Sequence, residues 1–322
     1  MKNIYLNIYK PNLVNLKRAK KNVEDNNVIG IPTETVYGLA GNAYSDRSIK
    51  KIFKLKKRPN FNPLIIHFKN LNDLKNDVNL NTNFKKLYSA FCPGPITFIL
   101  KKKKKSRISK LATARKKTVA VRIPKHKVAR KLLSILKFPL AAPSANISSK
   151  LSPTSAKDVF EEFGNKIKFI LDGGQCKIGL ESTIIDLTGI PSILRPGSIT
   201  VKKIQKILKT KIKIKKNLKR IKAPGQLKIH YSPGIPVNMN RKNAEKNQAL
   251  IGFGKKFKAG KNYFNLSKKG NLKEAANNLY KTMRQIRKRS FKSIAVEKIP
   301  NTGIGYAIND RLRKASSKWI VQ

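Results

Sequence analysis

Short apolar runs that end at a proline or a glycine recur along this chain, and they limit its possible folds more than any other feature. The run at 28–31, closed by Pro32, is the first of them. Segments this short fit strands better than helices, because a buried strand needs only about four to eight residues. The further predicted strands are 63–68, 96–100, 119–123, 140–142, 169–171, 183–187, 193–194, 249–253 and 294–296. Helical periodicity appears between them at 48–57, 272–287 and 310–317, and this alternation predicts an α/β protein.

The segment 206–235 breaks this alternation and separates two predicted domains. Lysine and isoleucine alternate over 209–222, and proline and glycine then interrupt the backbone at 223–225 and 232–234. Such a stretch is typical of a linker that lies over a surface. In a chain of 322 residues we therefore predict an N-terminal domain over 1–205, a basic linker over 206–235 and a smaller C-terminal α/β domain over 236–322.

The chain carries a formal net charge of +56, which would attract any polyanion at low salt. One interpretation is contact with nucleic acid, and a weak contact with RNA stays open. We favour the other interpretation, in which an AT-rich genome inflates lysine, asparagine and isoleucine together, because the lysines are scattered and form no single arm. Charge alone therefore does not identify the function.

The sequence also bears on the compartment in which the protein works. No apolar run approaches the roughly 18 residues of a membrane-spanning helix, and no apolar stretch follows the basic N-terminus as it would in a secretory signal. Cys92 and Cys176 are far apart and form no CxxC motif, which argues against a disulfide scaffold or a cysteine-rich zinc site. We expect a protein of the reducing cytoplasm with no membrane contact.

Several common site motifs are missing from the sequence. It contains neither a GxxxxGKS/T phosphate loop nor HExxH, and its three histidines lie too far apart for a local metal cluster. The GxG at 252–254 lacks a third glycine and a following helix, so we expect a turn there. No metal site of the protein's own is predicted.

Lys56 stands where the helix at 48–57 should present an apolar side chain. It follows Ile52 and Phe53 at helical spacing and so continues their buried face. A lysine in that position either extends past the helix end to solvent or points into an internal cavity. Arg58 is close enough to reach the same place.

Polar side chains also accompany the predicted strands. Thr118, Ala120 and Arg122 share one face of the strand at 119–123, which suits the wall of a wet pocket where Arg122 grips a carboxylate or phosphate with two guanidinium nitrogens. An edge strand with one solvated face is the alternative. Similar positions at other strand ends are held by Ala142, Ser144, Asn146, Ser182, Asp186 and Arg195. With no well-placed acid, base or nucleophile among them, these residues predict a pocket that holds anions.

Eight segments of the chain occur in the order known from one enzyme family. They are IPTETVYGL at 31–39, KKRP at 56–59, NPLIIH at 62–67, PGPIT at 93–97, VAVRIP at 119–124, APSAN at 142–146, ESTII at 181–185 and LRPG at 194–197. Together they strongly resemble the YrdC-type threonylcarbamoyl-AMP synthases, whose signature joins KxR, here Lys56 and Arg58, to SxN, here Ser144 and Asn146. APG at 223–225, HYSP at 230–233 and GIGYAINDRL at 303–312 resemble the longer, two-domain form.

The resemblance implies a fold, a reaction and partners. The fold is a twisted, mostly mixed α/β sheet with a concave basic cavity, followed by a smaller Rossmann-like α/β domain. The reaction joins L-threonine, bicarbonate or CO2 and ATP into L-threonylcarbamoyladenylate and releases pyrophosphate, with Mg2+ expected on the ATP. A separate transferase complex then moves the threonylcarbamoyl group to the tRNA adenosine next to the anticodon.

The resemblance also assigns roles to residues by their position in the motifs. Lys56 and Arg58 are expected to be catalytic. The residues expected around ATP are Lys56, Arg58, Asn60, Thr118, Ser144, Asn146, Ser152, Arg195, His230 and Tyr231, with Thr118 between the two substrates. Those expected around threonine are Thr33, His67, Arg122, Ala142 and Ser182, with Arg122 on the carboxylate. His230 and Tyr231 would reach back from the linker as a lid that excludes water from a labile adenylate.

The sequence departs from the family pattern in two places. Ser149 stands where glycine is usual, which alters the loop leading to Ser152. The stretch 284–289 is basic where an acidic residue is usual, which puts any interaction role of that helix in doubt.

Two other functions compete with the synthase. One is a non-catalytic RNA-binding accessory protein, which the basic charge would suit. The other is a carbamoyl-transferring domain of hydrogenase maturation, which would need zinc-finger and acylphosphatase segments that the sequence lacks. The intact pair of motifs around Lys56 and Ser144 favours the synthase.

Overall fold

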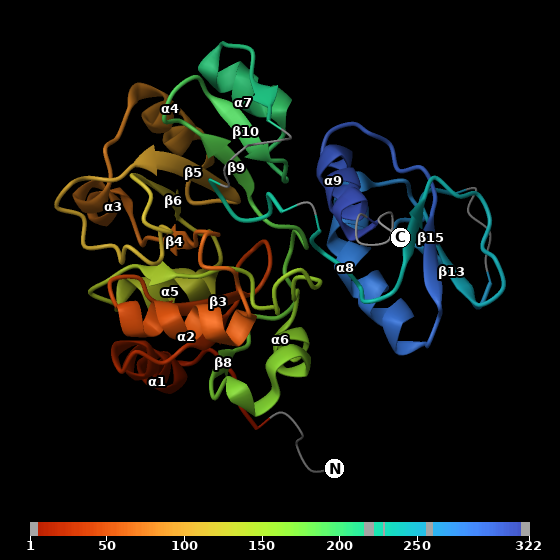
Figure 1. The fold of residues 1–322 in the computed structure, drawn as a ribbon, viewed down its shortest axis with the longest axis horizontal. Coiled ribbons are helices and arrows are strands. Elements are labelled where there is room, and N and C mark those ends of the chain that lie inside the picture. Colours follow the sequence, from red (N-terminus) through yellow and green to blue (C-terminus); the bar gives the residue numbers. More distant parts are fainter. Residues whose placement is uncertain (1–5, 216–221, 228, 256–259, 317–322) are drawn as a thin grey trace.

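A computed structural model describes residues 6–215, 222–227, 229–255 and 260–316, which form two domains side by side (Figure 1). The first domain is built on an 11-stranded mixed sheet of order β1-β8-β2-β3-β7-β4-β6-β5-β9-β10-β11. Its strands are β1 Ile8–Tyr9, β2 Ile29–Ile31, β3 Gly38–Asn42, β4 Ile65–His67, β5 Ile96–Lys101, β6 Thr118–Arg122, β7 Leu140–Ala141, β8 Ile170–Leu171, β9 Thr183–Asp186, β10 Ser192–Arg195 and β11 Lys213–Ile214. The predicted mixed α/β fold is confirmed.

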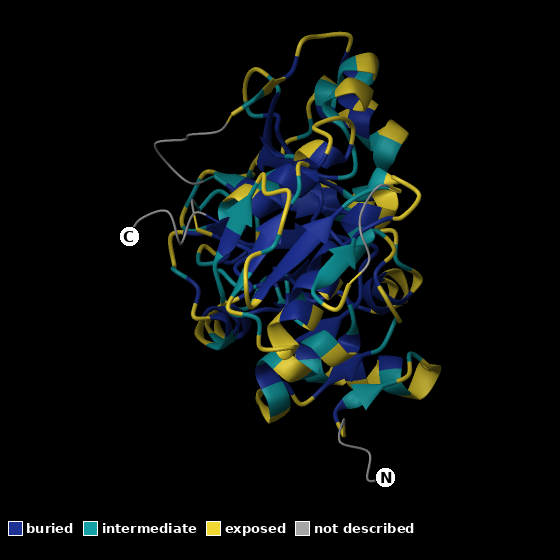
Figure 2. Ribbon diagram, turned by 90° about the vertical axis from the view of Figure 1, so that its right-hand side faces the viewer, coloured by how far each residue is buried: buried dark blue, intermediate teal, exposed yellow. Residues whose placement is uncertain are grey.

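Helices cover this sheet, and most begin at a polar cap. They are α1 Leu13–Glu24, α2 Asp46–Lys56, α3 Leu71–Asp77, α4 Thr82–Phe91, α5 Lys127–Ser134, α6 Ala156–Phe163, the 3-10 turn η1 Gly164–Lys166 and α7 Val201–Leu208. The side chain of Ser45 accepts a hydrogen bond from a backbone N–H in the first turn of α2, and Asn81 does the same for α4. Ser155 and Asp158 form a reciprocal capping box at the start of α6. Figure 2 shows the buried strands in the middle of the molecule with half-exposed helices around them.

The second domain is a parallel sheet of order β12-β15-β13-β14 with two long helices. Its elements are β12 Val237–Met239, β13 Gln248–Gly252, β14 Tyr263–Asn265, α8 Leu272–Lys288, β15 Ser293–Val296 and α9 Gly305–Ser316. Both helices lie on the side of this sheet that faces the first domain (Figure 1). The parallel sheet agrees with the predicted smaller α/β domain.

An apolar cluster joins the two domains. Leu151 and Leu180 of the first domain pack in the same buried cluster as Leu279 of α8. Gly179, at a φ of +76°, lets α8 approach closely, because a Cβ there would lie 2.6 Å from the Cα of Asn277. The two domains therefore share one buried interface.

The predicted linker has two different parts in the structure. Lys213–Ile214 pairs in parallel with β10, so the first sheet continues past residue 205. Residues 222–227 and 229–235 return across the end of the first domain, whereas 216–221 and 228 lie outside the described residues. The domain limits at 205 and 235 stay a prediction. Among the described helices, none has the length and apolar character needed to cross a membrane.

Candidate active site

A cavity lies where strands of the first sheet end and the returning segment, here residues 222–227 and 229–231, passes over them. The predicted site residues that line it are Thr33, Arg58, His67, Arg122, Ala142, Ser144, Ser182, Arg195, His230 and Tyr231. Strands β4 and β6 are parallel neighbours, and His67 is the register partner of Arg122. Each is the last residue of its strand, so both lie at the same end of the two strands. The fold thus gathers residues that are far apart in the sequence.

Arg122 forms one wall of the cavity and is already held by protein groups. Its Nη2 donates to Glu34 Oε1 at 2.8 Å, and its Nη1 donates to Thr35 Oγ1 at 2.9 Å. Only Nε has no partner among the described residues. Strand β6 lies between β4 and β5, so the alternative of a solvated edge strand is wrong. A guanidinium has five N–H donors and these two bonds use two of them, so Nε stays available to a ligand.

His67 adds a neutral ring beside Arg122. Burial, together with the Arg122 charge, lowers the pKa of His67 to about 3. The imidazole is therefore uncharged at neutral pH and offers one donor and one acceptor. Neither ring nitrogen has a partner among the described residues, as expected for groups that await a polar ligand.

Arg58 and Arg195 bring two more positive charges to the cavity. Arg58 donates from Nε to Asn62 O at 2.9 Å and from Nη2 to Asn62 Oδ1 at 2.6 Å. Arg195 donates to the backbone and hydroxyl oxygens of Ser182, both at 3.1 Å. Burial and the Arg195 charge lower the pKa of Arg58 to about 9. Buried like charges of this kind are stabilised by an anion between them.

Lys56 is buried and is not among the residues that line the cavity, so its expected part in ATP binding and catalysis stays a prediction. Its Nζ donates to the backbone oxygens of Ser144 and Asn146, which is neither of the two outcomes expected from the sequence. Burial is the main reason that the pKa of Lys56 is lowered. Asn146 in turn donates to Ile147 O at 2.7 Å and Lys150 O at 3.0 Å. Lys56 and Asn146 therefore shape the loop that carries Ser144.

Replacing Lys56 with methionine is expected to destabilise the first domain. Methionine fills the space but leaves Asn146 O without a donor, while Ser144 O keeps only the backbone N–H of Asn146 at 3.0 Å, and a buried unpaired group costs about 1–3 kcal/mol. The melting temperature and the urea midpoint should both fall. Lys57→Met, at the exposed neighbouring position, is the control. A Lys56→Met protein as stable as the control would contradict a structural role for this lysine.

Three other predicted residues lie away from the cavity lining. Ser152 is buried and donates to Glu181 Oε1 at 2.6 Å. Asn60 is exposed in the loop after α2. Thr118 begins β6, at the opposite end of the strand from Arg122. Their assignment to ATP stays a prediction, because none of the three is among the residues that line the cavity.

Two carboxylates that sequence reasoning overlooked lie at the site. Glu34 pairs with Arg122, and although burial alone would raise its pKa, the Arg122 charge and hydrogen bonds lower it. Glu181 lines the cavity, and burial is again outweighed by Arg311 and Arg195, which lower its pKa to about 2. The sequence predicted a site without a well-placed acid, and this prediction is wrong because two carboxylates lie at the site. Both groups are ionised and paired, however, so neither is a free acid or base.

The returning segment closes one side of the cavity. Tyr231 is buried there, and Gly225 passes so close that a Cβ would lie 2.8 Å from Arg195 Cδ. The space that remains is about 30 Å³, whereas one water needs roughly 10–15 Å³. The cavity is therefore narrow while this segment is in place.

Comparison with known proteins covers nearly the whole chain. A family model described as "Telomere recombination" matches residues 21–197, and one described as "Threonylcarbamoyl-AMP synthase, C-terminal domain" matches residues 199–317. The threonylcarbamoyl-AMP synthase of Pyrococcus abyssi is 37% identical over 326 residues, which cover 93% of each chain. That of Bacillus subtilis is 34% identical over 328 residues, covering 95% of this chain and 94% of that one.

Solved structures give the same result. The crystal structure of P. abyssi Sua5 complexed with L-threonine superposes with a TM-score of 0.88 at 34% identity and covers 96% of each chain. E. coli YciO, at 23% identity and a TM-score of 0.55, covers 61% of this chain and shares the fold of the first domain. The family predicted from the motifs is confirmed, and the chain belongs to the two-domain, Sua5-type threonylcarbamoyl-AMP synthases.

Proposed function

We propose that this protein joins L-threonine, bicarbonate or CO2 and ATP into L-threonylcarbamoyladenylate and releases pyrophosphate. The observation that carries the proposal is the burial of Arg58, Arg122 and Arg195 around one cavity, where Glu181, the one carboxylate among the described lining residues, is already paired. Such a site is suited to two anionic reactants. Its family relatives, which carry the synthase name over their full length, support the same reaction.

The chemistry needs positioning and charge neutralisation more than a covalent catalyst. The threonine nitrogen adds to CO2 and loses a proton, which forms a carbamate. A carbamate oxygen then attacks the α-phosphorus of ATP, the bond from this phosphorus to the bridging oxygen breaks, and pyrophosphate leaves with the electron pair. Correct orientation of two reactants can lower such a barrier by about 7–11 kcal/mol. Fixed donors on the developing charge add roughly 2.7–4 kcal/mol each.

We assign the two ends of the cavity to the two substrates. Threonine would lie near Thr33, His67, Arg122, Ala142 and Ser182, where its carboxylate meets Arg122 Nε and its polar groups meet His67. The phosphates of ATP would lie near Arg58 and Arg195, below the loop of Ser144. His230 and Tyr231 would then close over the nucleotide and keep water from the adenylate.

Magnesium is proposed to arrive with ATP. No group of three or more His, Cys, Asp or Glu side chains able to hold a metal occurs among the described residues, and Glu34 and Glu181 are neutralised by arginines. Mg2+ usually binds substrate phosphates and several waters and needs few protein ligands. The residues present are compatible with that arrangement, and the ion would neutralise phosphate charge.

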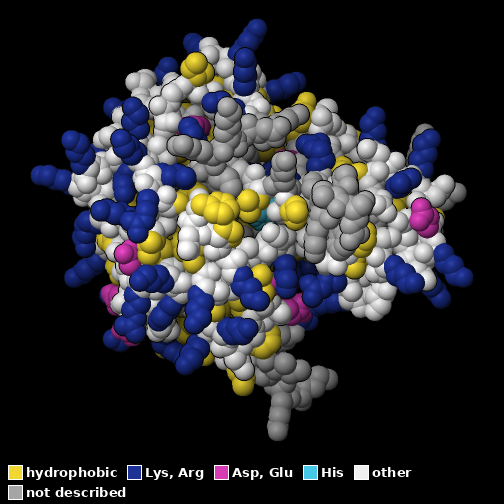
Figure 3. All heavy atoms as spheres, in the orientation of Figure 1, with side chains coloured by type: hydrophobic (Ala, Val, Ile, Leu, Met, Phe, Trp, Pro, Cys, Tyr) yellow, Lys and Arg dark blue, Asp and Glu magenta, His cyan; other side chains and the backbone are white. Residues whose placement is uncertain are grey.

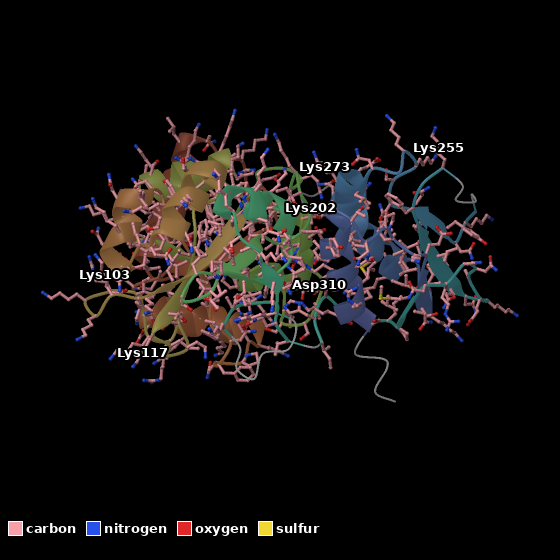
Figure 4. All side chains as sticks on the ribbon, turned by 90° about the horizontal axis from the view of Figure 1, so that it is seen from above. Lys103, Lys117, Lys202, Lys255, Lys273 and Asp310 are labelled. Carbon is pink, nitrogen blue, oxygen red and sulfur yellow. The ribbon has the colours of Figure 1, made fainter. Side chains whose placement is uncertain are left out.

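The product identifies the class of reaction that must follow. A mixed anhydride of a carbamate and AMP hydrolyses readily, so a transferase must take it up soon after release. We propose that this transferase acts on tRNA. An RNA-binding protein without catalysis is less well supported, because lysines and arginines are scattered around the visible face in Figure 3, whose centre is apolar and uncharged. Lys103 and Lys117 project from one end of the molecule and Lys255 from the other in Figure 4.

The direct test is synthesis of the adenylate by the purified protein. We expect incubation with ATP, Mg2+, L-threonine and 13C-bicarbonate to yield threonylcarbamoyladenylate that carries the heavy carbon, detected by mass spectrometry, together with an equal amount of pyrophosphate. Omitting threonine is the control and should abolish both products. ATP cleavage that is indifferent to threonine and bicarbonate would contradict the proposal.

A further inference from the structure

An ion pair crosses between the domains directly behind the cavity. Glu181 lines the cavity, and Arg311 of α9 donates from Nε to Glu181 Oε2 at 2.8 Å. Tyr280 of α8 donates its hydroxyl to Oε1 of the same carboxylate at 3.1 Å. Arg311 is completely buried, and the adjacent Asp310 lies where the two domains meet in Figure 4. The second domain thus reaches a residue of the proposed active site.

The same turn of α9 also holds the returning segment. The guanidinium carbon of Arg311 lies 5.1 Å from the centroid of the Tyr231 ring, within the range of a cation–π contact. Lys314, one turn later, donates from Nζ to Gly225 O at 2.8 Å. The backbone N–H of His230 donates to Lys314 O at 3.2 Å. The segment that closes the cavity is therefore attached to the C-terminal domain.

A buried ion pair is a costly way to join two domains. The desolvation of both charges offsets most of their attraction, and apolar residues of similar size usually stabilise an interface at least as well. Apolar contacts already join the domains through Leu151, Leu180 and Leu279. The pair lies where its carboxylate borders the cavity and its guanidinium faces Tyr231, which indicates a role in the site.

We infer that Arg311 is a positioning residue, which fixes the Glu181 carboxylate and holds Tyr231 in the cavity wall, so that docking of the C-terminal domain completes the active site. This inference deepens the proposed function and rests on it. It also gives the C-terminal domain a defined role, because α9 holds the returning segment through Lys314 and joins it to Glu181 through Arg311.

The charges around Glu181 make this inference testable by pH. The groups that face it are Arg311 and Tyr280 from the C-terminal helices, Arg195 from β10, Ser152, and His230 and Tyr231 from the returning segment. Burial would raise the pKa of Glu181, but Arg311 and Arg195 lower it to about 2. Without Arg311 the pKa rises, and the carboxylate is lost as the pH falls through the raised value.

The experiment compares Arg311→Gln, Glu181→Gln and the double variant with Arg287→Gln, an exposed arginine of α8. For Arg311→Gln we expect kcat/KM for ATP to fall about tenfold to hundredfold and activity to decline further between about pH 7 and pH 5, a limb that the unmodified protein lacks. Amide hydrogen exchange in the peptide with His230 and Tyr231 should accelerate roughly tenfold or more. Arg287→Gln should match the unmodified protein in kcat/KM for ATP, in the pH dependence of activity and in the rate of hydrogen exchange.

The double variant separates positioning from simple stability. It removes both charges of the Glu181–Arg311 pair, and Asp310 keeps its ion pair with Lys314, so we expect its melting temperature to recover relative to either single variant, while kcat/KM stays low. A double variant with the kcat/KM of the unmodified protein would show that the pair only joins the domains. Hydrogen exchange does not depend on catalysis. Unchanged exchange around Tyr231 in Arg311→Gln therefore overturns the inference even if the adenylate assay fails, and faster exchange supports it.

Discussion

Replacing Arg58 with glutamine is expected to lower the rate of pyrophosphate release by about 10²–10³-fold, the usual loss for one preorganised donor at a reaction centre. Arg58 is buried and lines the cavity, and Asn62 and Pro63 hold its guanidinium through three hydrogen bonds. It is therefore fixed before the substrate arrives. Because its charge acts most strongly on the phosphate during transfer, kcat and kcat/KM should fall together.

The neighbouring residue provides the control for Arg58. Lys57 is exposed, so Lys57→Gln removes the same charge close by without touching the cavity. Its turnover should equal that of the unmodified protein, and the melting temperatures of both variants show whether the fold is intact. A folded Arg58→Gln protein with normal pyrophosphate release would show that Arg58 is not at the reaction centre.

Replacing Arg122 with glutamine is expected to affect both stability and threonine use. The change leaves Glu34 as a buried charge without its arginine, and breaking such a pair typically costs about 3–5 kcal/mol of folding free energy. It also removes the charged group assigned to the threonine carboxylate. A charge-assisted hydrogen bond of this kind contributes about 1.5–3 kcal/mol, so KM for threonine should rise roughly tenfold to hundredfold.

The double change Arg122→Gln with Glu34→Gln separates these two effects. It removes both buried charges, so thermal unfolding should return toward that of the unmodified protein. KM for threonine should stay high, while KM for ATP changes little. A stable double variant that uses threonine at normal concentrations would place the carboxylate of threonine elsewhere.

The strands were predictable because their signal is local. Apolar runs such as 96–100 and 119–123 end at clear breakers or charges, and the structure places β5 and β6 there. Helices such as α4 and α7 were not predicted, although the apolar residues Val201, Ile204 and Leu208 of α7 lie at helical spacing. The helix caps Asn81 and Thr200 were further signals for these two helices.

The site was predictable where a motif held the residue and unpredictable where tertiary packing decides the role. Arg58, Arg122 and Arg195 all line the cavity, as expected. Lys56 belongs to the same motif, yet it binds backbone oxygens, because the path of the loop at 144–146 cannot be deduced from spacing. The contact of Arg311 with Glu181 spans 130 residues, and no local pattern reveals it.

The most direct measurement is a crystal structure of the protein with L-threonine and a non-hydrolysable ATP analogue bound together. We expect the threonine carboxylate beside Arg122, the α-phosphate between Arg58 and Arg195, and the reacting groups within about 3–3.5 Å once CO2 is joined to the amine. Tyr231 should lie over the nucleotide. Threonine and the nucleotide in separate places, or a nucleotide distant from both arginines, would contradict a cavity that works by bringing two anions together.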